Sequence, residues 1–166
     1  MESASVSPYA QRTEFLFLSA SLSTTMKFVS VATAVLAFAL PAFAQTESLS
    51  YDTTYDNPSL PLTSVACSDG ANGLITKGYT TLGSLPTFPN VGGVYTVTGW
   101  NSPACGTCYN VTYGGKTLSV LAVDVGLDGF NLSEEAMNTL TGGLAVELGR
   151  VEVTATQVPA SICGIH

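Results

Sequence analysis

Residues 99–111 read GWNSPACGTCYNV and place Cys105 and Cys108 in a Cys-x-x-Cys spacing. This spacing occurs in redox dithiols, in halves of zinc sites, and where two unrelated disulfides happen to end close together. The three alternatives correspond to an oxidoreductase, a metalloprotein and a disulfide-stabilised extracellular domain. The compartment of the protein and the remaining cysteines distinguish between them.

A secretory signal peptide is predicted at residues 26–44, which read MKFVSVATAVLAFALPAFA. Lys27 supplies an early positive charge, an apolar run follows, and Ala42-Phe43-Ala44 forms a small-x-small cleavage site. A transmembrane helix fits less well, because the apolar run is short for a bilayer and the cleavage-like site follows it at once. We therefore expect a secreted mature chain at residues 45–166, extracellular or bound to the cell wall, without stable membrane insertion.

Residues 1–25 precede this signal peptide, although a signal peptide normally begins at the first residue. We interpret residues 1–25 as an extension of the gene model, with translation starting at Met26. The alternative is a long, atypical n-region. The remaining residues, 45–166, are expected to form one domain with enough chain for a modest core.

The expected mature chain is acidic. It has three strong bases against ten acids and therefore a net charge of −7. Such a surface repels phosphate backbones and anionic lipid headgroups, so nucleic acid is a poor partner. Few charges and many small polar residues instead favour a neutral, hydroxyl-rich partner.

All four cysteines fall in this mature chain, at Cys67, Cys105, Cys108 and Cys163. An even number of cysteines in a small secreted domain indicates a disulfide framework. Zinc would need further ligands, and the only histidine is His166, so we expect no metal site. A redox motif normally opens a helix, whereas the run CYNVTY that begins at Cys108 predicts a strand. Structural disulfides are therefore favoured, and the residues alone leave three pairings open.

Short strands dominate the predicted secondary structure. Alternating or β-branched patterns predict strands at residues 93–100, 108–115, 116–125 and 144–158. Gly114-Gly115 is predicted to form a tight hairpin turn between two of them. Many short strands with one helix favour a small β-barrel.

One helix is predicted over residues 130–143. Asn131 is its expected N-cap, and Glu134 is the expected partner in a capping box. The helix is expected to end at Gly142, because glycine adopts the left-handed conformation that terminates helices.

Six segments, taken in order, resemble the cerato-platanins, a family of small secreted fungal proteins. They are SYDTTYD, CSDGANGLIT, FPNVGGV, GWNSPACGTCY, VLAVDVGLDGFNLSEEAMNTLTGG and LGRVEVTATQV. The resemblance implies a β-rich, single-domain double-psi β-barrel, similar to the barrel of expansins. It also implies the disulfides Cys67–Cys105 and Cys108–Cys163, so that the two cysteines of the opening motif belong to different bridges.

The resemblance further implies a carbohydrate-binding groove. Members of the family bind chitin-type N-acetylglucosamine oligomers, disturb polysaccharide packing without clear hydrolysis, self-assemble at surfaces and elicit plant defence. The positions that match the groove are Asp124 and Asn131, with Tyr51 and Asp52 of the N-terminal motif nearby. Relatives with the expansin barrel have His-Phe-Asp where this chain has Ala122-Val123-Asp124, so the His is missing.

Several of these residues have a structural alternative. The residues alone favour a turn-capping role for Asp124 at the end of an apolar strand, and the resemblance favours hydrogen bonding to a sugar instead. Trp100, the only tryptophan, could stack on a sugar face if it were exposed, but it is expected in the core. Asp69 is expected to form an Asx-turn. Asn110 and Asn131 each begin an N-glycosylation sequon. We expect Asn131 to be unmodified, because a glycan would obstruct the groove, and leave Asn110 open.

These observations predict a secreted, non-hydrolytic binder of chitin or other neutral polysaccharide oligomers. The protein would loosen or mask wall polysaccharide and act as an elicitor perceived by a plant receptor. It is expected to need no cofactor and to be a monomer or to self-assemble weakly. One alternative is a weak glycoside hydrolase or lytic transglycosylase, which needs a second carboxyl group near Asp124. The other is a surface-active wall protein, which needs a large exposed apolar patch.

Overall fold

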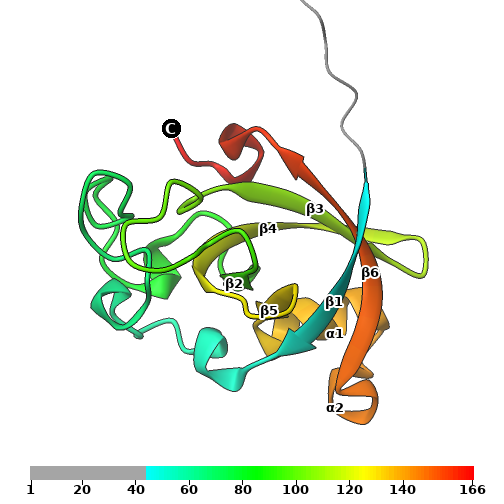
Figure 1. The fold of residues 1–166 in the computed structure, drawn as a ribbon. Helices are drawn as coiled ribbons and strands as arrows, with labels where there is room; N and C mark the ends of the chain where they lie inside the picture. Colours follow the sequence, from blue (N-terminus) through cyan, green and yellow to red (C-terminus); the bar gives the residue numbers. More distant parts are fainter. Residues whose placement is uncertain (1–43) are drawn as a thin grey trace, which may run out of the picture. The chain divides into compact units, whose positions relative to one another are not determined.

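The computed structural model describes residues 44–166, whose six strands form a closed barrel (Figure 1). The strands are β1 (Gln45–Tyr51), β2 (Val91–Val94), β3 (Cys108–Tyr113), β4 (Lys116–Val125), β5 (Phe130–Leu132) and β6 (Arg150–Val158). Around the barrel they follow the order β1-β5-β2-β4-β3-β6. This architecture confirms the β-rich double-psi barrel that the family resemblance implies. Except for Ala44, the expected signal peptide and the segment ahead of it lie outside the described residues.

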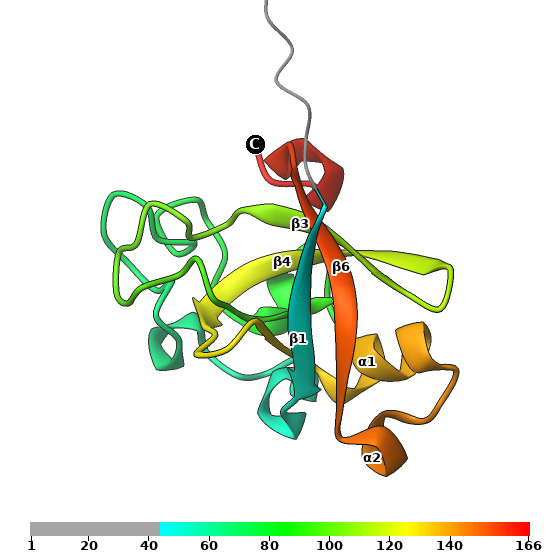
Figure 2. The ribbon, with the colours of Figure 1, turned by 45° about the vertical axis from the view of Figure 1, so that its right-hand side comes forward.

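Both parallel and antiparallel pairs build the barrel wall. β1 pairs with β5 and β2 pairs with β4 in parallel, and the other neighbours are antiparallel. The seam between β1 and β6 runs from the pair Gln45↔Ala155 to the pair Ser50↔Arg150. Figure 2 shows these two strands crossing the face of the barrel side by side. The first and last strands of the domain therefore close it.

The core lies inside the barrel. Along β6, Val151, Val153 and Ala155 are buried while the residues between them are exposed, as expected for a strand with one face inward. Phe130 of β5 is 1 % exposed. Its ring packs edge-to-face against Tyr95 and Tyr109, with centroids 5.9 and 5.5 Å away.

Two glycines let β2 approach its neighbours closely. A Cβ atom on Gly93 would lie 2.4 Å from the carbonyl oxygen of Val125, and one on Gly92 would lie 2.2 Å from the Asn131 carbonyl oxygen. Neither distance is compatible with a side chain. The segment VGGV is therefore suited to the crowded position between β4 and β5.

The hairpin between β3 and β4 confirms one sequence prediction directly. Gly114 and Gly115 have φ values of 54° and 82°, and the flanking residues Tyr113 and Lys116 are paired. Positive φ at both central residues is typical of the two-residue turn that matches strand twist. The strands predicted on either side of this turn are present.

The predicted helix at residues 130–143 is confirmed in its centre and at Gly142, but its beginning is wrong. Helix α1 (Glu134–Thr141) has Ser133 as its N-cap, and the Ser133 Oγ accepts a hydrogen bond from the Ala136 N–H at 3.0 Å. Asn131 is not a cap, because it lies in β5. The backbone there pairs with both β1 and β2, and this pairing keeps the chain extended.

Two predicted strand boundaries are also wrong. The strand expected at 144–158 begins only at Arg150, because helix α2 (Ala145–Leu148) precedes it and ends at Gly149 with a positive φ. The strand expected at 93–100 lies earlier, at Val91–Val94. The chain turns directly afterwards, where the Val97 N–H donates to the Val94 carbonyl.

Two disulfides stabilise the domain, with the pairing that the resemblance implies. Cys67–Cys105 connects the loop at 66–79 to the loop at 99–107, and Cys108–Cys163 connects the start of β3 to the short helix η4 (Ala160–Cys163). Three further 3-10 turns complete the domain: η1 (Thr53–Asp56), η2 (Leu62–Ser64) and η3 (Leu82–Ser84). Among residues 44–166 no helix is long and apolar enough to span a membrane.

Candidate functional site

The strand register brings five residues into one row across the barrel wall. Asp124 of β4 pairs with Gly93 of β2, and Gly93 also pairs with Asn131 of β5. Asn131 pairs with Ser50 of β1, which pairs with Arg150 of β6. Residues that are paired across strands share one face of a sheet. The row thus collects a carboxylate, an amide, a hydroxyl and a guanidinium from distant parts of the sequence.

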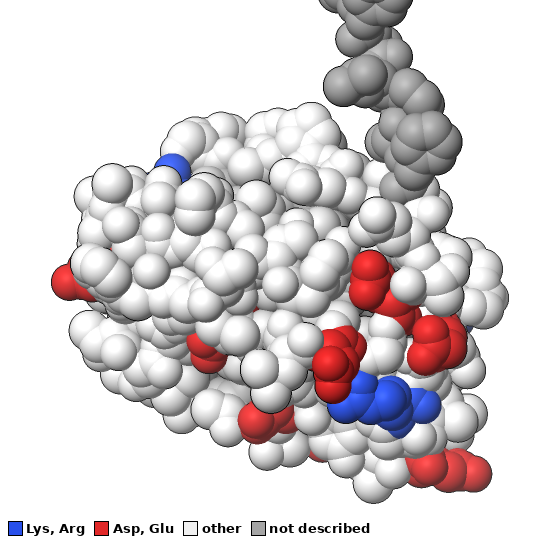
Figure 3. Space-filling model, viewed as in Figure 1, with Lys and Arg blue, Asp and Glu red and all other residues white. Residues whose placement is uncertain are grey.

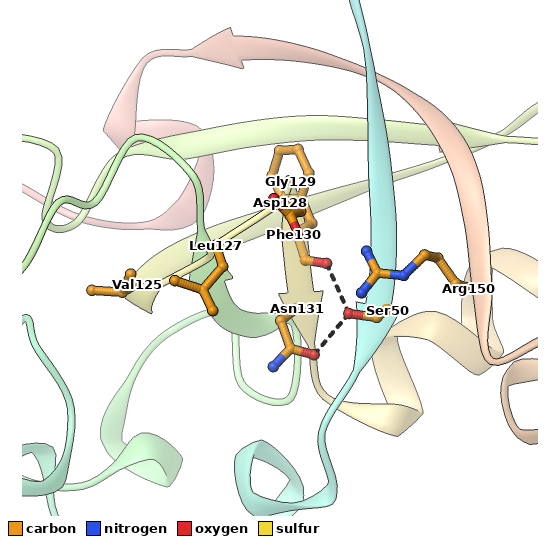
Figure 4. A pocket seen from close by; sticks show the side chains of 8 residues that line it. All are labelled: Ser50, Val125, Leu127, Asp128, Gly129, Phe130, Asn131 and Arg150. Atoms are coloured by element: carbon orange, nitrogen blue, oxygen red, sulfur yellow. Dashed lines mark hydrogen bonds between the residues drawn. The ribbon is translucent and has the colours of Figure 1, made fainter.

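Part of this row lines an open cleft of about 240 Å³. Figure 4 shows the side chains of Ser50 and Asn131 directed toward each other, between Leu127 and Arg150. The remaining lining residues are Val125, Asp128, Gly129 and Phe130. Ser50 Oγ donates to Asn131 Oδ1 at 3.1 Å. The Asn131 Nδ2 makes no hydrogen bond within residues 44–166, so its two N–H groups remain for a ligand.

The two sides of the cleft differ in chemistry. Arg150 is exposed, and its Nη1 donates to Ser48 Oγ at 2.5 Å. Ser48 Oγ in turn donates to the backbone carbonyl of Asp128. On the other side, Leu127 is 90 % exposed. Figure 3 shows a basic patch flanked by acidic groups over the lower part of β1 and β6, so the cleft combines an apolar rim with mixed polar groups.

Asp124 lies at the end of the row but does not line the cleft. Its Oδ1 accepts hydrogen bonds from the backbone N–H groups of Ala66 and Val125, at 3.0 and 2.8 Å. Its Oδ2 accepts from the Tyr55 hydroxyl at 3.1 Å. These contacts fasten the end of β4 to the segment that follows β1. The residue of β4 that lines the cleft is the next one, Val125.

Tyr55 is the only side chain of the described residues that bonds to Asp124. Burial raises the pKa of the Tyr55 hydroxyl above its ordinary value of 10.0, and the Asp124 carboxylate raises it further. Tyr55 therefore remains a neutral hydrogen-bond donor well into the alkaline range.

Tyr51 and Asp52 lie beside the row without lining the cleft. Tyr51 is half-buried at the end of β1 and packs against the core. Asp52 is exposed, and its Oδ1 accepts from the Thr54 N–H at 2.8 Å as the N-cap of η1. Of the four site residues that the resemblance implies, only Asn131 lines the cleft. Sequence reasoning missed Ser50, Leu127 and Arg150, because their proximity depends on strand register, which no motif reveals.

Trp100 corrects another sequence prediction. It was expected in the core, yet it is 64 % exposed. Its loop lies outside the barrel, and the indole Nε1 donates to Asp69 Oδ1 at 2.7 Å. This hydrogen bond holds the pKa of Asp69 below its ordinary value of 3.8. Asp69 thus orients the indole, and no hydrogen bond among residues 44–166 gives it the Asx-turn expected from the sequence.

A second cleft, of about 330 Å³, lies at the start of α1. Its residues are Thr53, Asp56, Glu134, Glu135 and Asn138. The Asp56 carboxylate accepts from the N–H groups of Glu134 and Glu135, at 2.9 and 3.0 Å. This carboxylate completes the helix cap. Within the described residues, no group of three or more His, Cys, Asp or Glu side chains is arranged to hold a metal ion.

A closed barrel with two disulfides and a polar surface cleft defines a small, disulfide-stabilised β-barrel protein. The family model described as cerato-platanin matches residues 47–165. The chain therefore belongs to the cerato-platanin family. Members of this family are secreted fungal proteins that are not classed as enzymes, and the two disulfides fit an extracellular location.

Individual relatives support this assignment. The chain is 56% identical to the heat-stable 19 kDa antigen of Coccidioides posadasii, over 74% of this chain and 84% of that protein. The crystal structure of cerato-platanin 3 from M. perniciosa is similar with a TM-score of 0.69 and 52% identity, covering 72% of this chain and 98% of that one. The solution structure of the fungal elicitor Cerato-Platanin has a TM-score of 0.64 and 46% identity, covering 70% and 95%.

Proposed function

We propose that this protein is a secreted, non-hydrolytic binder of chitin-type N-acetylglucosamine oligomers and that the cleft at Asn131 is its binding site. In this role it loosens or masks wall polysaccharide and acts as an elicitor of plant defence, perceived through a plant receptor. The observation that carries the proposal is the open amide of Asn131, held by Ser50 between an apolar and a basic neighbour.

The chemistry of the cleft matches an N-acetyl group. The free N–H groups of Asn131 are donors for the acetyl carbonyl, and the exposed Leu127 offers an apolar contact for the acetyl methyl. Arg150 supplies further donors for ring hydroxyls. A cleft with a few placed polar groups beside apolar surface is typical of small-ligand recognition.

The contacts of Asp124 support binding without hydrolysis. Glycosidic cleavage needs one carboxyl group as proton donor and a second as base or nucleophile. Both oxygens of Asp124 already accept hydrogen bonds from the protein. The hydroxyl that faces Asp124 belongs to Tyr55, whose pKa is raised, so it is a poor acid. Binding instead competes with the hydrogen bonds that hold polysaccharide chains together.

Calorimetric titration of the purified protein with soluble N-acetylglucosamine oligomers tests the proposal. Asn131→Ala should weaken binding by about tenfold, on the order of the loss of one hydrogen bond. Asn110→Ala is the matched control, because Asn110 is also a strand amide that accepts from a serine, Ser119 Oγ at 2.8 Å, but lies outside the cleft. Equal affinities of the wild type and Asn131→Ala would contradict the proposed site.

Product analysis of the same samples tests the hydrolase alternative. We expect no new reducing ends from the oligomers or from cellulose. Release of products that is lost in Asp124→Asn would overturn the non-hydrolytic mechanism. Unchanged oligomers together with measurable binding would support it.

One observation favours the surface-active alternative. Leu144, Val146 and Leu148 are all exposed on and beside α2, and exposed apolar groups that lie together promote assembly at interfaces. A Val146→Ser variant that retains sugar binding but loses surface activity would show that the two properties reside on different parts of the barrel.

A further inference from the structure

We propose that Trp100 forms a second sugar-binding site, a stacking platform for a pyranose ring that is separate from the cleft. This proposal rests on the proposed function only in taking the same class of ligand, a neutral polysaccharide. None of the residues that line the cleft belongs to the loops at 66–79 and 99–107, which build the platform.

The platform is rigid although it is made of loops. The backbone N–H of Asn72 donates to Asn101 Oδ1, and Asn72 Nδ2 donates to the backbone carbonyl of Asn101, both at 2.9 Å. Gly70 packs so closely against Asn101 that a Cβ there would lie 2.6 Å from the Asn101 Oδ1. The disulfide Cys67–Cys105 joins the same two loops. A preorganised surface loses less entropy when a ligand binds.

The exposure of Trp100 is otherwise unfavourable, because a large apolar side chain gains free energy when it leaves water. Its only polar atom, Nε1, is already occupied by Asp69 at 2.7 Å. The hydrogen bond fixes the orientation of the ring, and the exposed surface of the indole is therefore apolar. Such a surface fits the C–H face of a pyranose ring.

Asp69 adds a polar contact at the edge of the platform. The hydrogen bonds that it receives from other residues of 44–166, Trp100 and Ser68, both end on Oδ1. No other residue of 44–166 donates to Oδ2, which can therefore accept a hydrogen bond from a hydroxyl group of a sugar that lies on the indole. Ionised acceptors make stronger hydrogen bonds than neutral ones.

The same carboxylate disfavours other partners of an exposed tryptophan. An anionic ligand would be repelled by Asp69 and by the net charge of −7. A purely apolar partner would bury an ionised carboxylate without replacing its water. A neutral ligand with hydroxyl groups around an apolar face avoids both costs. With the cleft, the platform gives the protein two points of attachment, so binding to a polymer gains by avidity.

Intrinsic fluorescence tests the platform directly, because Trp100 is the only tryptophan in the chain. Titration of the purified full-length secreted product with soluble N-acetylglucosamine oligomers should shift its emission to the blue and protect it from acrylamide quenching. Asn131→Ala should retain this shift, since the cleft is a separate site. An unchanged emission spectrum at oligomer concentrations that saturate the calorimetric signal would overturn the proposal.

Retention on insoluble chitin tests the contribution of the side chain. Trp100→Ala should weaken retention by roughly tenfold, and Trp100→Phe should restore part of it, because an aromatic face remains. Ile162→Ala is the matched control for removing an exposed apolar side chain, since Ile162 is 58 % exposed on η4. Equal retention of Trp100→Ala and Ile162→Ala would overturn the platform.

These outcomes separate the two proposals. Loss of binding in Asn131→Ala, with no fluorescence change in the wild type, would support the cleft as a binding site and contradict the platform. A fluorescence shift in the wild type, with unchanged affinity of Asn131→Ala, would contradict the cleft as a binding site and support the platform. Absence of any binding by the wild type overturns both.

Discussion

Asp69 and Trp100 hold each other at the surface of the molecule. The indole N–H bonds to the ionised carboxylate of Asp69, and this hydrogen bond is the main cause of the lowered pKa of Asp69. Asp69 and Trp100 are 31 residues apart in the sequence. Sequence reasoning placed Trp100 in the core because it is large and apolar, and nothing nearby in the chain identifies the distant acceptor of its N–H.

This pair predicts an acid transition that the single tryptophan reports. Because the pKa of Asp69 is lower in the folded protein than its unfolded value, the hydrogen bond contributes its full stability above pH 3.8. That contribution is lost as the pH falls through the lower, folded pKa. We therefore expect the fluorescence of Trp100 to titrate with a midpoint below 3.8. Asp69→Asn should lack the transition.

Circular dichroism recorded alongside separates this local titration from acid unfolding. A midpoint at or above the ordinary pKa of a free aspartate, with the fold intact, would show that the hydrogen bond does not favour the ionised form.

Helix α1 begins where a strand ends, and this junction has two caps. Ser133 Oγ accepts from the Ala136 N–H and donates to the Pro89 carbonyl at 2.6 Å. Asp56 satisfies the N–H groups of Glu134 and Glu135. The first N–H groups of the helix, which have no partner within it, are thereby paired with the N-cap Ser133 and with Asp56 of η1.

We expect Ser133→Ala to lower the free energy of unfolding by about 1–2 kcal/mol, because it removes an N-cap in a buried position. Asn131→Ala should cost less, since Asn131 is not the cap. Urea denaturation of the two variants measures the difference. A larger loss of unfolding free energy in Asn131→Ala than in Ser133→Ala would indicate that Asn131 is the N-cap, as the sequence pattern predicts.

Predictability at this scale depends on how local the determining contacts are. The hairpin at Gly114-Gly115 and the end of α1 at Gly142 are specified by residues that adopt positive φ, so the sequence reveals them. β5 contains three residues, too few for a periodic pattern, and its partners lie in β1 and β2. The capping pattern around Asn131 therefore predicts a helix start where the structure has a strand.

For the whole molecule, two covalent links constrain the unfolded chain. The cysteines of the two bridges are 38 and 55 residues apart. In the chain-entropy account, loops of these lengths stabilise the folded state by about 4 kcal/mol each. We expect the paired variants Cys67→Ser/Cys105→Ser and Cys108→Ser/Cys163→Ser each to lose most of that amount in urea denaturation.

Mass spectrometry of unreduced peptides provides the independent measurement. It should recover the two linked peptides of this pairing. A peptide linked between Cys105 and Cys108 would contradict both the pairing and the assignment of the opening motif to two separate bridges.

The barrel and the bridges could be anticipated, because the resemblance covers nearly the whole described domain. The cleft could not. The row from Asp124 to Arg150 exists only because five strands pair in one particular register, and a slip of one residue would turn these side chains to the other face. The sequence could therefore name Asn131 but not its neighbours Ser50 and Arg150.

The pairing of β1 with β6 determines when the molecule can become complete. A ribosome makes β1 first and β6 last, so the earliest strand must wait for the final one before the wall can close. Until then β1 has an unpaired edge, which is a template for joining other chains. The barrel therefore cannot close before β6 has been made, and removing β6 should leave an aggregation-prone chain rather than a smaller folded one.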